Sequence, residues 1–246
     1  MGDVKVRFLG SGDAFGSGGR FQACISVRWP AGHLLLDCGA SSLVAMKQLG
    51  MDPESIDAVV VSHLHGDHFG GIPFLVLDQQ FARRHKPLLL AGPRGIRQRV
   101  SQAMEVLYPA SSTVERRFEV QCIELEPGVE TQVGVARVTG YTVEHPSGAP
   151  SLALRVACSG RLIAYTGDTS WTDSLVEVAD GADLLVSEAY TFDKSVKYHM
   201  AYTTLRAHRP QLRCRRVVLT HLGPDALARR RELEDEVAED GLLLEL

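Results

Sequence analysis

One segment, from Ala58 to Ile72, limits what this chain can fold into more than any other. It reads AVVVSHLHGDHFGGI, in which a run of β-branched residues predicts a buried strand and the following turn carries His63, His65, Asp67 and His68. Imidazole nitrogens and carboxylate oxygens are the ligands that suit zinc and similar divalent ions. The segment therefore predicts a metal site at the end of a strand. The alternative is a polar loop whose histidines only cap the next helix.

Three further candidate ligands lie far along the chain from this turn, each just after an apolar run. His145 follows the letters TVE, Asp168 ends the segment IAYTGD, and His221 follows VVLT. One turn cannot surround a metal ion, so distant residues have to complete the coordination. Chemistry in open α/β architectures collects outside the carboxyl ends of strands. We therefore expect these three side chains to converge on the histidine-rich turn.

The composition is that of an ordinary globular protein. The 246 residues are 45% hydrophobic and 23% charged, and we expect one domain over residues 1–246. A net charge of -4 argues against a surface that coats nucleic acid, and five scattered cysteines without CxxC spacing argue against a thiolate zinc site. No apolar run approaches the roughly 18 residues of a membrane helix, and no leader pattern is recognisable. We therefore expect a cytoplasmic protein without a membrane partner.

Three local predictions concern segments that return below. Alternating polarity predicts a strand from Arg116 to Leu125. The segment from Asp225 to Glu239 predicts a solvated helix whose arginines and carboxylates pair at i,i+4 spacing. His33, beside a predicted hairpin turn, is expected on the surface.

The candidate ligand segments together resemble the metallo-β-lactamase superfamily of metallohydrolases. The resemblance rests on HLHGDH, the lone His145, GDT and THLG in this order, and it covers nearly the whole chain. The segments FLGSGDAFGSGGR, LLLDCG, SEAYTF and HMAY point further to the ribonuclease Z and phosphodiesterase branch. The resemblance implies an α/β (α+β) fold, a four-layer αββα sandwich of two mixed sheets with helices outside and the site at one edge. It also implies a homodimer.

Carried over residue by residue, the family pattern implies two divalent metal ions. His63, His65 and His145 would hold the first ion, and Asp67, His68 and His221 would hold the second. Asp168 would bridge the two ions. Zinc is the expected metal, with manganese and iron as alternatives, and no other cofactor is expected. Two ions roughly 3.5 to 4 Å apart can hold a hydroxide between them that serves as the nucleophile. Asp37 would orient a ligand histidine.

The resemblance also implies a proton donor beyond the metals. Glu188 lies in SEAYTF and His199 in HMAY, which match the SEATF-like and HSTA-like segments of ribonuclease Z and its relatives. His199 would be the general acid for the leaving alkoxide, Glu188 would keep it protonated and oriented, and Asp67 belongs to the catalytic set with them. HMAY departs from HSTA at two positions. A surface histidine beside Tyr198 is therefore the alternative interpretation.

These features predict a metal-dependent phosphodiesterase that acts on a small or nucleotide-like anionic substrate. Ribonuclease Z activity on tRNA 3′ ends is an alternative, but the interval from His145 to Asp168 is too short for the tRNA-holding arm of that enzyme. Thioester or lactone hydrolysis is a second alternative, since similar dinuclear sites polarise carbonyl groups. A protein that binds metal or an anion without catalysis is a third.

Overall fold

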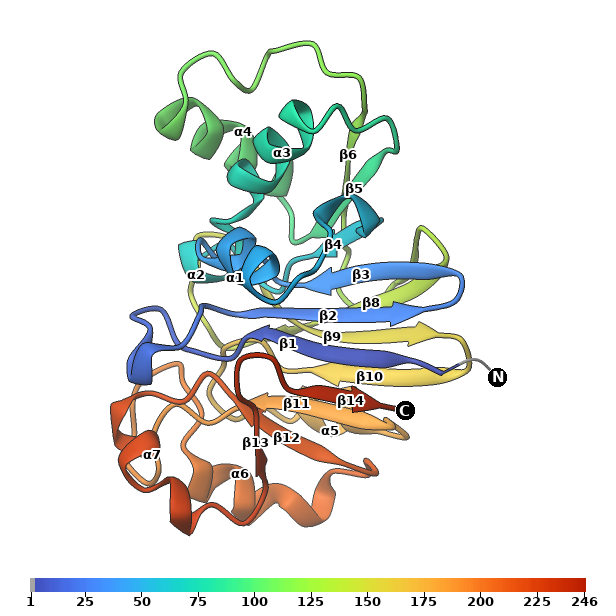
Figure 1. Cartoon of the computed structure of the whole chain (residues 1–246). Helices are drawn as coiled ribbons and strands as arrows, with labels where there is room; N and C mark the ends of the chain where they lie inside the picture. The colour runs from blue at the N-terminus through green and yellow to red at the C-terminus, as the bar shows by residue number, and fades with distance from the viewer. Residues whose placement is uncertain (1–2) are drawn as a thin grey trace.

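The structure is a computed structural model that describes residues 3–246. Its fold is a sandwich of two mixed β-sheets with helices on both outer faces (Figure 1). The first sheet has the strand order β14-β1-β2-β3-β4-β5-β6. Its strands are β1 (Lys5–Gly10), β2 (Cys24–Trp29), β3 (Gly32–Leu36), β4 (Ala58–Val60), β5 (Leu88–Gly92), β6 (Val120–Glu124) and β14 (Leu243–Glu245).

The second sheet has the order β13-β12-β11-β10-β9-β8-β7. Its strands are β7 (Glu130–Val133), β8 (Ala136–Val143), β9 (Ser151–Cys158), β10 (Arg161–Tyr165), β11 (Leu184–Glu188), β12 (Val217–Thr220) and β13 (Glu236–Val237). Strands β10, β11 and β12 run parallel, as do β3, β4, β5 and β6 in the first sheet. The carboxyl ends of neighbouring parallel strands therefore lie at the same edge, where loops can bring side chains together.

The helices form the two outer layers. The first sheet is covered by α1 (Ser42–Gln48), α2 (Gly66–Phe69), α3 (Ile72–Phe81) and α4 (Ile96–Leu107), and the second by α5 (Ser174–Ala179), α6 (Tyr202–His208) and α7 (Pro224–Ala228). Within residues 3–246, none of the helices combines the length and the apolar character needed to cross a membrane. The predicted four-layer αββα arrangement is confirmed.

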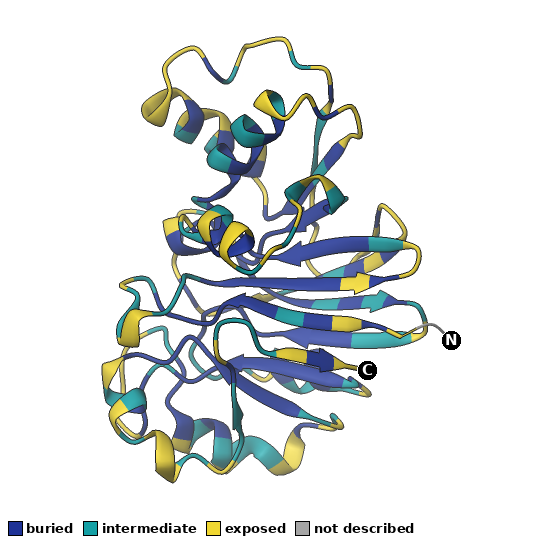
Figure 2. Cartoon of the chain, in the orientation of Figure 1, coloured by how far each residue is buried: buried dark blue, intermediate teal, exposed yellow. Residues whose placement is uncertain are grey.

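Strand alternation divides the apolar residues among three cores. The strands of both sheets are coloured as buried along most of their length in Figure 2. In β4, Ala58 and Val60 face the core between the two sheets, whereas Val59 faces the core under helices α1–α4. In β12, Val218 faces the core between the sheets, and Val217 and Leu219 face the helices of the second sheet. Successive strand side chains point to opposite faces, so a strand that is covered on both sides is apolar at every position. This explains the unbroken apolar run before the histidine-rich turn.

The prediction of one helix from Asp225 to Glu239 is wrong. Helix α7 ends at Ala228, a single 3-10 turn follows over Arg230–Glu232, and β13 then pairs in parallel with β12. Ala238 is fully buried in the core between the sheets. Tertiary pairing has overridden local helix propensity here, and the charges pair outside any long helix: Arg229 contacts Asp193 and Glu232, and Arg230 contacts Glu239.

Two smaller predictions also need correction. The strand predicted from Arg116 begins only at Val120, and the residues before it form a turn and loop. His33 is buried and not on the surface, with 4% of its area exposed. Its Nε2 lies 2.8 Å from the Ser26 hydroxyl and its Nδ1 lies 3.0 Å from the Ser55 hydroxyl, so both ring nitrogens have partners inside the protein.

The burial of His33 predicts acid sensitivity of the fold. Burial, with a smaller contribution from Arg28, lowers the pKa of His33 from 6.5 to about 4. Between these two values the unfolded chain binds a proton that the folded chain does not, so the free energy of unfolding falls as the pH falls. From about pH 7 to about pH 5 we expect this group to cost roughly 2 kcal/mol. Urea denaturation of wild type and His33→Gln at both values measures the difference, and an equal pH dependence in the two proteins would contradict the prediction.

Candidate metal centre

The histidine-rich turn connects β4 to α2 and presents its side chains toward the other sheet. His63 and His65 lie in the loop after β4, while Asp67 and His68 lie in the single turn of α2 that begins at Gly66. His65 is the N-cap of that turn and has extended backbone angles, so the chain changes direction between the two pairs of ligands. These four side chains, although close together in the sequence, therefore belong to two different groups.

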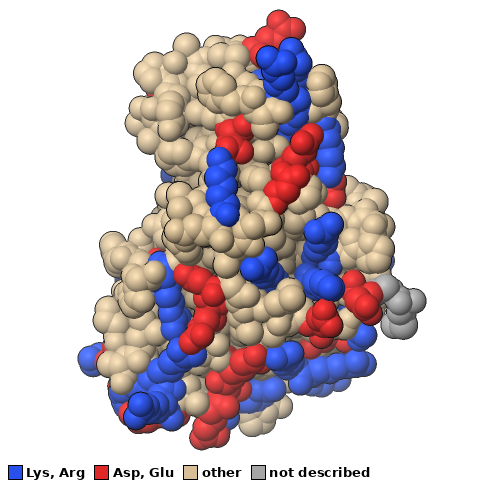
Figure 3. Space-filling model, viewed as in Figure 1, with Lys and Arg blue, Asp and Glu red and all other residues tan. Residues whose placement is uncertain are grey.

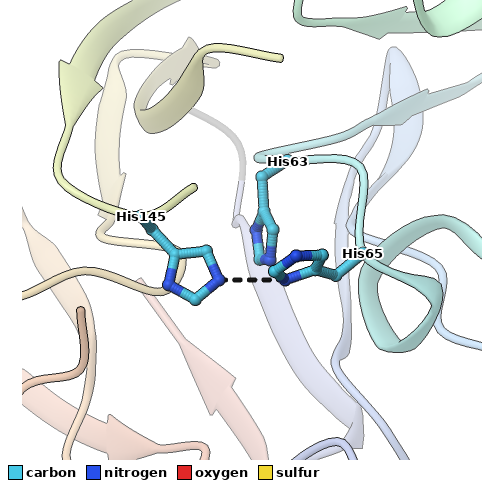
Figure 4. Close-up of side chains that lie close together, drawn as sticks. All are labelled: His63, His65 and His145. Atoms are coloured by element: carbon cyan, nitrogen blue, oxygen red, sulfur yellow. Dashed lines mark hydrogen bonds between the residues drawn. The ribbon is translucent and has the colours of Figure 1, made fainter. Parts of the chain in front are cut away.

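The first group consists of His63, His65 and His145, which Figure 4 shows pointing toward one another. His145 Nε2 lies 2.9 Å from His65 Nδ1, and the His63 and His145 rings are 4.7 Å apart between centroids. His145 Nδ1 donates to the Tyr198 carbonyl at 2.9 Å. This contact leaves the Nε2 atom of His145 free to face the other two imidazoles, which is how a metal-binding histidine is usually oriented.

The second group consists of Asp67, His68, Asp168 and His221, all of them buried. His68 Nε2 lies 3.2 Å from an Asp67 oxygen and 3.3 Å from an Asp168 oxygen. His221 Nε2 lies 3.3 Å from Asp67 and 3.4 Å from Asp168. Asp168 also lies 4.0 Å from His63 Nε2. This carboxylate therefore stands between the two groups.

Buried polar atoms without partners show that these residues fit metal ions. Four such atoms at this site make no hydrogen bond within residues 3–246: Nε2 of His63, Nε2 of His68, Oδ1 of Asp168 and Nδ1 of His221. A buried polar atom without a partner is costly, and natural proteins keep few of them. Nitrogen and oxygen atoms of this kind are the donors that zinc and similar ions prefer.

The charged side chains of the site shift one another's pKa values. Burial alone would raise the pKa of Asp168, but His221 and His68 outweigh it and hold that pKa well below its usual value. Burial would likewise lower the pKa of His221, but Asp168 and the hydrogen bond that His221 donates to Asp67 raise it to about 9. The pKa of His63 is lowered by burial and by the neighbouring His68. The carboxylates are therefore ionised and ready to bind cations.

Asp37 organises the site from behind, which confirms the supporting position expected for it. Its carboxylate accepts hydrogen bonds from His68 Nδ1 at 2.6 Å, from the Ser62 backbone at 2.7 Å and from the Tyr165 hydroxyl at 2.9 Å. The first of these turns His68 Nε2 toward Asp67 and Asp168. Asp37 has a φ of 59°, in the left-handed region that aspartate tolerates better than most residues.

Glu188 and His199 form a pair at the rim of the second group. Glu188 is the last residue of β11 and fully buried, and its Oε2 lies 3.0 Å from His199 Nδ1. Burial and the nearby Asp168 raise the pKa of Glu188 to about 7. Burial opposes the protonation of His199, but Glu188 outweighs it and raises the pKa of the imidazole. The His199 side chain is 21% exposed and lies 4.0 Å from Asp168, so the interpretation as a plain surface histidine is wrong.

Sequence reasoning missed three supporting groups. The Ser62 hydroxyl contacts both Asp37 and His63, the Tyr165 hydroxyl reaches Asp37, and the Tyr198 carbonyl holds His145. Tyr165 ends β10 just before Gly167 and Asp168, so its place beside a ligand segment was the available signal. The Tyr198 contact involves a backbone atom 53 residues away from His145, for which no pattern in the sequence exists.

Known proteins share both the fold and parts of the sequence. Ribonuclease Z of Agathobacter rectalis is 26% identical over an alignment of 273 positions, gaps included, which covers 90% of this chain and 88% of that protein. The metallo-beta-lactamase fold protein YhfI from Bacillus subtilis superposes with a TM-score of 0.80 at 23% identity over 100% of both chains. The short form of human tRNase Z superposes with a TM-score of 0.78 at 25% identity over 98% of both chains.

These comparisons confirm the superfamily and the branch. The chain is a hydrolase of the metallo-β-lactamase superfamily and belongs to its ribonuclease Z and phosphodiesterase-like branch. A more specific match comes from the model of one family, described as Anti-Pycsar protein Apyc1, which aligns with residues 4–238. Since that match covers nearly the whole chain, this protein belongs to the Anti-Pycsar protein Apyc1 family.

Proposed function

We propose that this hydrolase is a metal-dependent phosphodiesterase for small or nucleotide-like phosphodiesters. The observation that carries the proposal is the hydrogen-bonded pair of Glu188 and His199 beside Asp168. In this pair the proposed proton donor, His199, lies next to the proposed metal ligand Asp168. Cleavage of a phosphodiester leaves an alkoxide, which has to be protonated as it departs. In this proposal His199 donates that proton, and Glu188, whose Oε2 lies 3.0 Å from His199 Nδ1, keeps the imidazole charged and oriented.

The seven predicted ligands would hold two divalent ions, with zinc as the proposed metal. When bound, such ions supply Lewis acidity and lower the pKa of a coordinated water toward neutrality. The protein itself contributes the orientation of the ligands and their burial. Asp37 and the Tyr198 carbonyl orient His68 and His145, and the buried setting excludes competing hydrogen bonds from bulk water. Asp67 contributes to the same chemistry through its contacts with His68 and His221.

Thioester or lactone hydrolysis is a weaker candidate. A thioester leaves as a thiolate, a weak base that needs no dedicated proton donor, whereas a lactone leaves as an alkoxide, as a phosphodiester does. The buried Glu188 and its hydrogen bond with His199 would have no evident task in thioester hydrolysis. The pair therefore favours the phosphodiesterase over the thioesterase.

Ribonuclease Z activity is a second candidate because the aligned relative carries that name. The alignment needs 273 positions although this chain has only 246 residues, so the relative contains segments that are missing here. Between His145 and Asp168 this chain has only the hairpin of β9 and β10 and its short connections. On the face shown in Figure 3, positive and negative side chains are interspersed and form no broad basic surface. We therefore propose no tRNA partner.

An assay with both kinds of substrate separates these two functions. We expect the zinc-loaded protein to hydrolyse bis(p-nitrophenyl) phosphate and dinucleotides, and to leave a pre-tRNA with a 3′ trailer uncut at the same enzyme concentration. Removal of metal by a chelator should abolish turnover, and added zinc or manganese should restore it. Efficient trailer removal would instead assign the protein to the ribonuclease Z activity.

Three further predictions are proposals that rest on the family resemblance and the composition. They are a homodimer, a cytoplasmic location and a single domain over residues 1–246. Light scattering of the purified protein tests the first, because a homodimer has twice the chain mass of 26.8 kDa.

A further inference from the structure

One arginine of helix α4 lies between the two loops that supply the three-histidine group. Arg99 Nη1 is 3.5 Å from the carbonyl of Leu64, the residue between His63 and His65. Its Nη2 lies 3.1 Å from the position that a Cβ at Gly148 would occupy, in the loop after His145. A side chain at Gly148, which also has a φ of +77°, would push the guanidinium away. The glycine thus leaves room for Arg99 beside the metal-binding loops.

Arg99 faces a cavity that opens beside the proposed metal ligands. The cavity has a volume of about 740 Å³, and its lining includes Gly66 and Asp67 from the histidine-rich turn. Apolar side chains, including Phe69 and Phe74, form most of the remaining wall, and Arg99 is the only Lys or Arg among the described residues that line it. Arg99 is half-buried in this mostly apolar wall, so its attraction for an anion is screened less than that of a fully exposed cation.

The guanidinium of Arg99 keeps most of its binding capacity. Within residues 3–246 it forms no ion pair, and its one hydrogen bond, to Leu64, is at 3.5 Å, the long limit for such a contact. A guanidinium has five N–H donors in a planar fork that matches the oxygens of a phosphate or carboxylate. By contrast, the buried Arg84 spends its donors on backbone carbonyls, including those of Ile56 and Pro87. Arg99 is therefore the free cation of this cavity.

We propose that Arg99 binds a charged phosphoryl oxygen of the substrate and so selects monoanionic phosphodiesters over neutral esters. The inference deepens the proposed function and rests on it for the identity of the anion. The phosphoryl group lies in the cavity between the proposed ligand Asp67 and the guanidinium. A neutral ester of the same shape leaves the guanidinium without a partner.

A purely structural role is the competing explanation, in which Arg99 only ties the two loops together. The contact with Leu64 is long and involves one donor of five, so it adds little to the stability of the loops. The two roles also differ in what they affect. Loss of a structural tie disturbs metal loading, whereas loss of an anion-binding group leaves metal loading unchanged and weakens only charged ligands.

The test measures binding separately from turnover. Isothermal titration of zinc-loaded protein compares diphenylphosphinate, an anion whose phosphorus–carbon bonds cannot be hydrolysed, with diphenyl sulfone, a neutral molecule of similar shape. The proteins are wild type, Arg99→Met, Arg99→Lys and, as a matched control on an exposed position of the same helix, Arg97→Met. Zinc content is measured for each protein.

We expect Arg99→Met to bind diphenylphosphinate about 10- to 100-fold more weakly, since a charge-assisted hydrogen bond is lost. Arg99→Lys should retain part of the affinity, and Arg97→Met all of it. Affinity for diphenyl sulfone and zinc content should not change in any variant. Wild-type affinity for diphenylphosphinate in Arg99→Met, a loss of zinc in that variant, or no binding of the anion to wild type would each overturn the inference. Failure of the proposed function looks different: wild type would not hydrolyse bis(p-nitrophenyl) phosphate, yet the anion would still bind through Arg99.

Discussion

Asp168→Asn is expected to reduce phosphodiester turnover on the order of 10³-fold or more and to lower the metal content to at most about one ion per chain. The change keeps the size of the side chain but removes the one carboxylate among residues 3–246 that lies within 4.0 Å of His63 and also contacts His68 and His221. A neutral amide cannot balance the charge of two cations held close together. Asp67 would still contact His68 and His221, but the carboxylate between these residues and His63 would be lost.

Metal analysis and steady-state kinetics on the same preparation measure both effects. Asp173→Asn is the matched control, because Asp173 is an exposed aspartate five residues further along the chain. The control should keep wild-type metal content and turnover. Full activity of Asp168→Asn with two ions bound would show that this carboxylate does not bridge a dinuclear site.

His199→Ala should lower kcat by about 10² to 10⁴ for a substrate with an alkoxide leaving group, such as a dinucleotide. The effect should be much smaller for bis(p-nitrophenyl) phosphate, because p-nitrophenolate leaves without help from an acid. Glu188→Gln should reproduce the same pattern more weakly, since it removes the charged partner 3.0 Å from the His199 ring and leaves the imidazole in place.

The double variant that combines His199→Ala with Glu188→Gln extends this test. If Glu188 acts through His199, combining the two changes should cost little more than His199→Ala alone. His85→Ala serves as a control at an exposed histidine just after α3 and should leave kcat unchanged. An equal loss of kcat for both leaving groups would refute the general-acid assignment of His199, because it would indicate a role in binding or folding.

The candidate ligand segments were predictable from local patterns because each of them follows an apolar run. A buried strand needs apolar residues on both faces, and the polar ligand directly after it marks the strand end. His63, Asp168 and His221 all follow this rule, after β4, β10 and β12. Parallel strands in a sheet then bring such ends to a common edge, so convergence could be expected without knowledge of the contacts.

Other features depended on contacts that no short pattern encodes. The segment after α7 has a helical composition, but β12 offers an unpaired edge and the core between the sheets has room for Ala238, so part of it becomes β13. His33 is buried because Ser26 and Ser55 satisfy both of its ring nitrogens. Local propensity is worth at most about 1 kcal/mol per residue for ordinary side chains, and such tertiary contacts exceed it.

By itself, then, the sequence predicted the strand ends beside the site and the candidate ligand types, because periodicity and ligand chemistry are local properties, and the four-layer class followed from the resemblance to a known superfamily. Only the tertiary structure decided which atoms meet. It placed Asp168 between the two histidine groups, brought the Tyr198 carbonyl to His145 and left the Arg99 guanidinium facing the cavity beside Asp67. Such distances depend on how two sheets pack face to face, which is set by the whole core rather than by any one segment.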